Sequence, residues 1–223
     1  MKIVVLVRTF NEEANIERFC KAYSFADQIL ISDFHSTDKT VKLALQFPNV
    51  MVRSFSETPE GEFYSHEPKH INQLIDWGIQ MGADWLIYDD ADCSPNYVLQ
   101  QDIRRIMEHP DISRIMLYRL YIYMMDRYFP HMNVPGQSFW AWKPAEVNVR
   151  ANEQMDPREQ NLMIPEIDGR TKMLDFPYCD LHFFFRDEQH LQAKLDWYKR
   201  KGQPQRHPTE WGKLEPLPTW ARV

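Results

Sequence analysis

Short aliphatic runs alternate with amphipathic patterns over the first half of the chain. Residues 3–7 form an unbroken β-branched and aliphatic run, which predicts a strand covered on both faces. Further strands are predicted at residues 28–32, 49–54 and 85–88, with helical spacing in the intervals. This alternation with short connections predicts an α/β fold with a mainly parallel sheet and helices on both faces.

The second half of the chain is less regular and carries most of the aromatic residues. The predicted elements are a helix around 99–107, a strand at 114–123, a loop with short strands at 127–142, a buried segment at 173–185 and a closing helix from near Asp187. Prolines after Gly202 predict an arm without regular structure, laid against the core through Trp211 and Trp220. We therefore expect a single domain over residues 1–201 and a C-terminal arm over 202–223.

Composition places the chain among globular proteins. It has 223 residues, enough for a full core, and 43% hydrophobic residues. The early apolar run is too short for a signal peptide or a membrane span, so a cytoplasmic location is the expectation. Its cysteines are odd in number and widely separated, which predicts buried free thiols in a reducing compartment.

Charge and glycine content exclude several classes of function. The formal net charge of -6 gives no general attraction to nucleic acid or anionic membranes, so an anionic substrate needs a bound cation or local Lys and Arg. Only 7 glycines are present, and neither the dinucleotide-binding pattern GxGxxG nor a P-loop occurs.

Three carboxylates follow the predicted strand at 85–88 within four positions: Asp89, Asp90 and Asp92. Carboxylates this close repel one another unless a divalent cation or hydrogen-bond donors neutralise them. A solvated acidic turn is the alternative interpretation. Because polar loops at 9–13 and 33–38 also follow predicted parallel strands, all three segments are expected at one sheet edge, where α/β folds bind ligands.

Three motifs in this order resemble the family 2 glycosyltransferases, whose nucleotide-sugar-binding fold is called GT-A. They are Val7-Arg8-Thr9-Phe10-Asn11-Glu12-Glu13, Asp33-Phe34-His35-Ser36-Thr37-Asp38-Lys39-Thr40 and Asp90-Ala91-Asp92. The resemblance implies a Rossmann-like GT-A fold with a nucleotide-sugar-binding half at 1–95 and an acceptor-side half at 96–201. Any one motif alone is a weak signal, since Asn-Glu-Glu or Ser-Thr-Asp is also ordinary helix-start chemistry.

The resemblance also implies which residues bind the nucleotide-sugar, with UDP as the expected nucleotide. Asp33 supplies a fixed acceptor for a base N–H, and Asp38 is expected to cap the next helix instead. Lys69 is either near phosphate or a solvated surface lysine. The expected nucleotide-binding residues are Thr9, Asn11, Glu13, Asp33, Lys69, Asn72 and Asp90.

A divalent cation, manganese or magnesium, is implied at Asp90, Asp92 and His182. His182 lies in Tyr178-Cys179-Asp180-Leu181-His182-Phe183-Phe184-Phe185-Arg186, which is similar to a C-terminal signature of some members; a packed core histidine is the alternative. Asp89 stands where the family usually has an apolar residue. It is expected either to be buried and paired or to displace a metal ligand by one position.

The catalytic base is where the chain departs from the family, because no Glu-Asp pair follows Asp92. Glu166 and Asp168 are the candidates, Glu153 and Asp156 are rivals, and solvated loop carboxylates are the alternative for all four. The aromatic stretch at residues 127–142 falls where the family builds its acceptor site. Trp140 and Trp142 are therefore expected to stack on an acceptor sugar, with core packing or a dimer contact as alternatives.

Together these patterns predict an inverting, metal-dependent glycosyltransferase that moves a sugar from a nucleoside-diphosphate sugar to a glycan or other hydroxyl acceptor. A non-catalytic nucleotide-sugar or glycan-binding protein of the same fold is the alternative. A haloacid dehalogenase-type phosphatase needs a nucleophilic Asp after the first strand, which here is followed by Arg8 and Thr9. A nucleotidyltransferase is expected to carry a Gly- and Arg-rich loop there instead.

Overall fold

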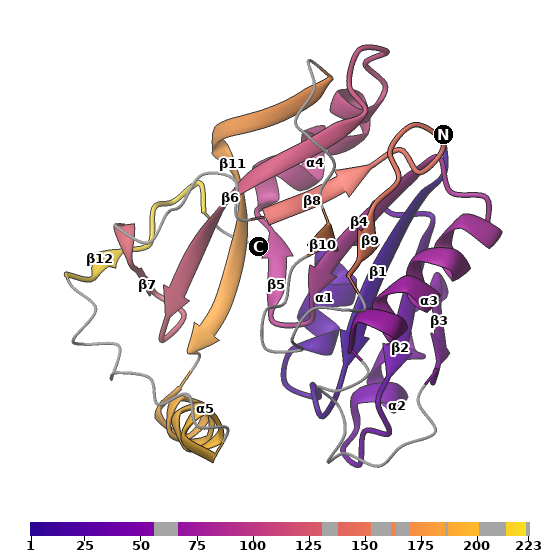
Figure 1. The fold of residues 1–223 in the computed structure, drawn as a ribbon. Coiled ribbons are helices and arrows are strands. Elements are labelled where there is room, and N and C mark those ends of the chain that lie inside the picture. The colour runs from indigo at the N-terminus through magenta and orange to yellow at the C-terminus, as the bar shows by residue number, and fades with distance from the viewer. Residues whose placement is uncertain are drawn as a thin grey trace.

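The computed structural model describes residues 1–55, 67–130, 138–152, 162–163, 170–185, 187–200 and 213–221 (Figure 1). Their elements, in chain order, are β1 (Ile3–Thr9), α1 (Ile16–Ala22), β2 (Gln28–Asp33), α2 (Thr40–Ala44), β3 (Val50–Arg53), α3 (Glu67–Gln80), β4 (Trp85–Asp90), β5 (Cys93–Pro95), α4 (Tyr97–Met107), β6 (Arg114–Tyr123), β7 (Arg127–Tyr128), β8 (Ser138–Trp142), β9 (Arg150–Ala151), β10 (Leu162–Met163), β11 (Thr171–Phe185), α5 (Glu188–Arg200) and β12 (Glu215–Pro216).

The first half of the chain forms the predicted parallel sheet. Strand β1 lies between β2 and β4, and β3 continues the sheet beyond β2. The register sets Thr9 beside Asp33 and Arg8 beside Asp90. Because parallel strands end at the same edge, the polar residues after all three strands meet there.

Helices cover both faces of this sheet, as the unbroken apolar run predicted. Ile3, Val5 and Val7 share one apolar core with residues of α1, α2 and α4. Val4 and Leu6 point to the other face and pack with residues of α3, which Figure 1 shows in front of the strands. Successive side chains of a strand point to opposite faces, so a strand that is buried on both faces is apolar at consecutive positions.

Antiparallel strands extend the sheet in the second half. Strand β8 lies between β4 and β6 and is antiparallel to both. The long strand β11 runs parallel to β6, beside which Figure 1 shows it, and antiparallel to the short β5. The pairing with β5 sets His182 opposite Cys93. A segment from the end of the chain is thereby brought to the edge at which β4 ends.

The described part of the C-terminal arm, residues 213–221, contains a strand where no regular structure was predicted. Residues Glu215–Pro216 form β12, which pairs with β7 and so caps an edge of the sheet. Trp220 does lie against the core: its ring packs on Phe176, and its carbonyl accepts a hydrogen bond from Asn96 Nδ2 at 2.8 Å. Trp211 lies outside the described residues.

The three cysteines are buried free thiols, as predicted: Cys20, Cys93 and Cys179. Within the described part of the chain, every helix is too short or too polar to cross a membrane.

Candidate active site

A buried hydrogen bond to Asp33 joins the end of β1 to the end of β2, and two further bonds fix Asp33 within its own loop. The Thr9 hydroxyl donates to Asp33 Oδ1 at 2.9 Å, and Ser36 donates from its backbone N–H to Oδ2 and from its hydroxyl to Oδ1. Asp33 is only 7% exposed. An ionised carboxylate has about four acceptor positions, so this fixed group retains capacity for one further donor.

Asn11 and Glu13 hold the same two loops together from the outside. The Asn11 side chain accepts from the Thr37 N–H at 2.8 Å, and Glu13 Oε2 accepts from the Lys39 N–H at 3.1 Å. Asn11 has a positive φ of 54°, a conformation that Asn tolerates better than most residues. The structure therefore shows a bracing role for both side chains at the rim of the site.

Asp38 acts at the start of α2, close to its predicted role. Helix α2 begins at Thr40, and Asp38 Oδ1 accepts from the Thr40 N–H at 2.9 Å. Its Oδ2 accepts from the Glu13 N–H at 3.0 Å, so the same carboxylate also ties in the loop after β1. The hydrogen bonds from Thr40 and Glu13 outweigh the effect of burial and lower the pKa of Asp38.

Asn72 has a structural partner on β9, and its predicted contact with the nucleotide stays a prediction. Its Nδ2 donates to the Ala151 carbonyl at 3.0 Å, and its Oδ1 accepts from the Ala151 N–H at 2.8 Å. The side-chain amide of Asn72 on α3 thus pairs with both backbone groups of Ala151 on β9, as a neighbouring strand would. Lys69, in the first turn of α3, is exposed, and its predicted contact with phosphate stays a prediction.

Asp89 is buried and paired, which decides between its two predicted placements. Its Oδ1 accepts from Arg119 Nη2 at 3.0 Å and from the Asp90 N–H at 2.9 Å, and its Oδ2 accepts from the Tyr23 hydroxyl. Burial raises the pKa of the Asp89 carboxyl well above its usual value. The charge of Asp180 raises it further, and Arg119 acts in the opposite direction.

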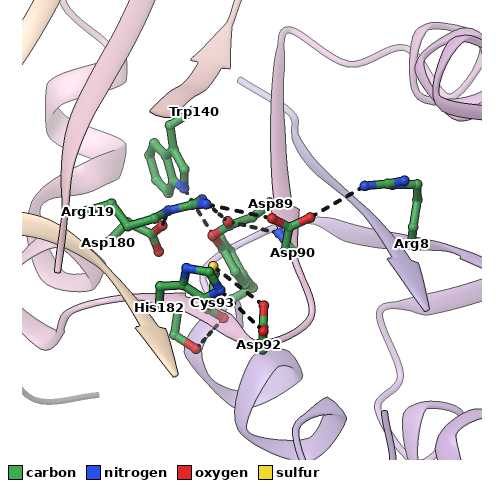
Figure 2. A network of polar contacts seen from close by, with 11 residues as sticks. Arg8, Asp89, Asp90, Asp92, Cys93, Arg119, Trp140, Asp180 and His182 are labelled. Carbon is green, nitrogen blue, oxygen red and sulfur yellow. Dashed lines mark hydrogen bonds and ion pairs between the residues drawn. The ribbon is translucent and has the colours of Figure 1, made fainter. Parts of the chain in front are cut away.

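Arg119 is the central cation of this edge and was not predicted. Its Nε donates to Asp180 Oδ2 at 2.6 Å, while Nη1 lies 3.7 Å from Asp90 Oδ2. Asp89 and Asp180 are both fully buried, and this single guanidinium lies between them (Figure 2). The available sequence signal was an arginine in the middle of the apolar strand 114–123, which also begins with Arg114.

Asp90 lies between two guanidinium groups, as Figure 2 shows. Arg8 Nη2 is 3.6 Å from its Oδ1, on the side opposite Arg119. The Asp90 side chain is 45% exposed, so it can still meet a ligand. Two guanidiniums thus flank Asp90 and partly neutralise its charge, although Arg119 is shared with Asp89 and Asp180.

Asp92 and His182 come together although 90 positions separate them, as the resemblance implied. His182 Nε2 lies 3.3 Å from Asp92 Oδ2, and the Phe183 N–H donates to the Asp92 carbonyl at 2.8 Å. Two neighbouring ligands of a cation bound at about 2.1 Å are about 3.0–3.4 Å apart, so the pair fits one divalent ion.

Cys93 completes a group that could hold a metal ion. The ligand atoms of Asp92, Cys93 and His182 all lie within 4.8 Å of one another, and Asp90 does not belong to this group. Burial raises the pKa of the Cys93 thiol well above its usual value; Arg119 opposes this, and the carboxylates of Asp180, Asp89 and Asp92 add to it.

The two tryptophans predicted to bind the acceptor are core residues. Trp140 is 0% and Trp142 is 1% exposed, because β8 lies between β4 and β6 and is covered on both faces. Trp140 Nε1 donates to the Tyr23 hydroxyl at 3.1 Å. Neither ring offers a face to a sugar. The candidate bases Glu166 and Asp168 and their rivals Glu153 and Asp156 lie outside the described residues.

Comparisons with known proteins give structural matches only: no family model and no curated protein matches the sequence. The structure of S. aureus TarS 1-349 in complex with UDP matches with 15% identity and a TM-score of 0.56, covering 81% of this chain and 60% of that one. The complex with UDP-GlcNAc matches with 16% identity and a TM-score of 0.54, covering 89% of this chain and 64% of that one. A longer TarS chain matches with 15% identity and a TM-score of 0.58, covering 89% of this chain and 38% of that one.

The chain thus spans less than two thirds of each of these TarS chains. At such low identity the likeness establishes architecture and no more. The sheet order, the helices on both faces and these matches agree on a single small domain. The chain has the Rossmann-like GT-A fold, as the resemblance to family 2 glycosyltransferases predicted.

Proposed function

We propose that the protein is a glycosyltransferase that moves a sugar from a nucleoside-diphosphate sugar, with UDP as the nucleotide, to a hydroxyl acceptor with inversion. The observation that carries this proposal is the pairing of Asp92 with His182 at the edge where β1, β2 and β4 end. This edge is where open α/β sheets bind nucleotides. The TarS structures that share the fold contain UDP and UDP-GlcNAc.

The charges at this edge support a cation-assisted diphosphate site. Four carboxylates and two guanidiniums lie at this edge: Arg8 pairs with Asp90, Arg119 pairs with Asp89, Asp90 and Asp180, and Asp92 lies beside His182. When all six groups are ionised, two negative charges remain. A manganese or magnesium ion held by Asp92 and His182 would balance them and, when bound, would supply Lewis-acid stabilisation to the departing diphosphate.

The roles of Asp33 and Asp90 follow from their geometry, and the base is assigned from the sequence alone. Asp33, fixed by Thr9 and Ser36, would accept the ring N–H of the base. Asp90, held between Arg8 and Arg119, would accept from a hydroxyl of the ribose or the sugar. Glu166 or Asp168 would remove the acceptor proton as inversion proceeds by direct displacement.

Nucleotide release from a panel of UDP-, GDP- and dTDP-sugars, with manganese, magnesium or EDTA, tests the proposal. We expect release that requires metal and falls by about 100-fold or more in Asp92→Asn, since one ligand is lost and the shape is kept. Asp111→Asn, at an exposed carboxylate, is the matched control and should retain activity. Metal-dependent UDP binding without release from any donor would instead indicate a non-catalytic binding protein.

A further inference from the structure

The side chains that lie together at the candidate cation site differ from the set that the sequence motif implies. Asp90 is flanked by two guanidiniums, whereas Cys93 has its sulfur within 4.8 Å of the ligand atoms of both Asp92 and His182. We propose that Cys93 is a ligand of the cation site together with Asp92 and His182, and that its sulfur makes the site prefer thiophilic cations of the zinc class.

The backbone presents these three side chains as a preformed group. His182 and Cys93 are register partners on the antiparallel strands β11 and β5, and Asp92 directly precedes Cys93. The Asp92 carboxylate faces both neighbours, with Oδ2 3.3 Å from His182 Nε2 and Oδ1 3.9 Å from Cys93 Sγ (Figure 2). One carboxylate, one imidazole and one thiol match three-ligand zinc sites that keep a position open for a substrate oxygen.

A second group of ligand atoms adjoins the sulfur on its buried side. The ligand atoms of Asp89, Cys93 and Asp180 also lie within 4.8 Å of one another. Asp180 is fully buried, and among the described residues its Oδ1 has no hydrogen-bond partner. Carboxylate oxygens thus lie near the thiol on its buried side, with the Arg119 guanidinium paired to two of them, and the unpartnered Asp180 Oδ1 adds an acceptor close to the proposed ligand set.

Softness of the donors decides which cation this set selects. Magnesium and manganese prefer oxygen ligands, while thiolate and imidazole favour zinc, cobalt or cadmium. On binding, the Sγ–H bond breaks, a sulfur–cation bond forms and the proton passes to the buffer, with no change in oxidation state. The inference rests on the cation site of the proposed function, not on sugar transfer itself.

Cobalt titration of metal-free protein tests the ligand directly, because a thiolate ligand produces a charge-transfer band. We expect the band in the native protein and in Cys20→Ser, a matched buried cysteine on α1, and its loss in Cys93→Ser. Zinc affinity should fall by about tenfold or more in Cys93→Ser, with a smaller change for manganese. A native protein that binds cobalt without the band would overturn the proposal.

X-ray absorption on the zinc-loaded native protein gives the same answer without any variant. A sulfur shell at about 2.3 Å beside nitrogen and oxygen at about 2.0–2.1 Å is expected, and a shell of nitrogen and oxygen alone contradicts the proposal. Donor turnover is measured separately. A sulfur shell without turnover supports Cys93 as a ligand and contradicts the proposed sugar transfer. Turnover without a sulfur shell supports the sugar transfer and contradicts Cys93 as a ligand.

Discussion

Arg119 and Asp180 are register partners on the parallel strands β6 and β11, and Arg119 Nε donates to Asp180 Oδ2 at 2.6 Å. The same guanidinium donates to Asp89 at 3.0 Å on β4, to which neither strand is directly paired. Arg119 therefore links the parallel half of the sheet to the segment that carries His182. A substitution of Arg119 is therefore expected to change how β4 and β11 are placed relative to each other at the site.

Replacing Arg119 with Met should strongly destabilise the fold. The substitution leaves the buried carboxylates of Asp89 and Asp180 without their cation, and breaking such a pair costs about 3–5 kcal/mol. Urea unfolding followed by circular dichroism measures the loss. Arg105→Met, whose ion pair with Asp102 is exposed, is the control and should change little. Equal effects of the two substitutions would show that Arg119 is not essential to this network.

Asp89 should make stability depend on pH in a defined direction. Because burial and the neighbouring Asp180 raise its pKa in the folded protein, its contribution is complete below the unfolded pKa of about 3.9 and is lost as pH rises through the folded pKa. In EDTA, Asp89→Asn should therefore gain stability relative to the native protein from about pH 4.5 to about pH 7.5. Urea unfolding at several pH values checks this, and a relative loss would contradict it.

Trp140→Phe should lower stability and leave sugar recognition unchanged. The substitution removes the N–H that donates to the buried Tyr23 hydroxyl and leaves a small cavity, for an expected cost of about 1–3 kcal/mol. Unfolding gives the stability, and donor and acceptor KM give the recognition. A raised acceptor KM in a fully stable variant would restore the acceptor role for this tryptophan.

The parallel half of the fold could be predicted because its signals are local. The β-branched run at residues 3–7 and the polar residues after three strands specify two covered faces and one polar edge. Motifs indicated that Asp33, Asp92 and His182 lie at this edge, and the structure places them there, while their binding roles stay predictions. Asp89 was recognised as a departure from the family, but only its neighbours show that it is buried and paired.

The rest depended on pairings between distant strands. Nothing local indicates that β8 enters the sheet between β4 and β6, so the same aromatic residues fit a sugar platform or a core, and the platform was wrong for Trp140 and Trp142. The pairing of Asn72 with Ala151 on β9 likewise could not be predicted, because the two residues are 79 positions apart. Arg119 and Cys93 acquire their roles only when β11 joins β6 and β5.

Asp90 and Asp92 should differ in their effect on cation binding, although each substitution by Asn removes one negative charge from the same edge. Asp92 faces His182 and Cys93, so Asp92→Asn removes a ligand and should weaken manganese and zinc by about tenfold or more. Asp90 faces Arg8 and Arg119, so Asp90→Asn should change cation affinity by less than about threefold. Calorimetric titration of metal-free protein compares the two, each serving as the charge-matched control of the other. Equal weakening in both variants would place Asp90 among the cation ligands, as the motif alone implied, and would mean that its two arginines move aside when the cation binds.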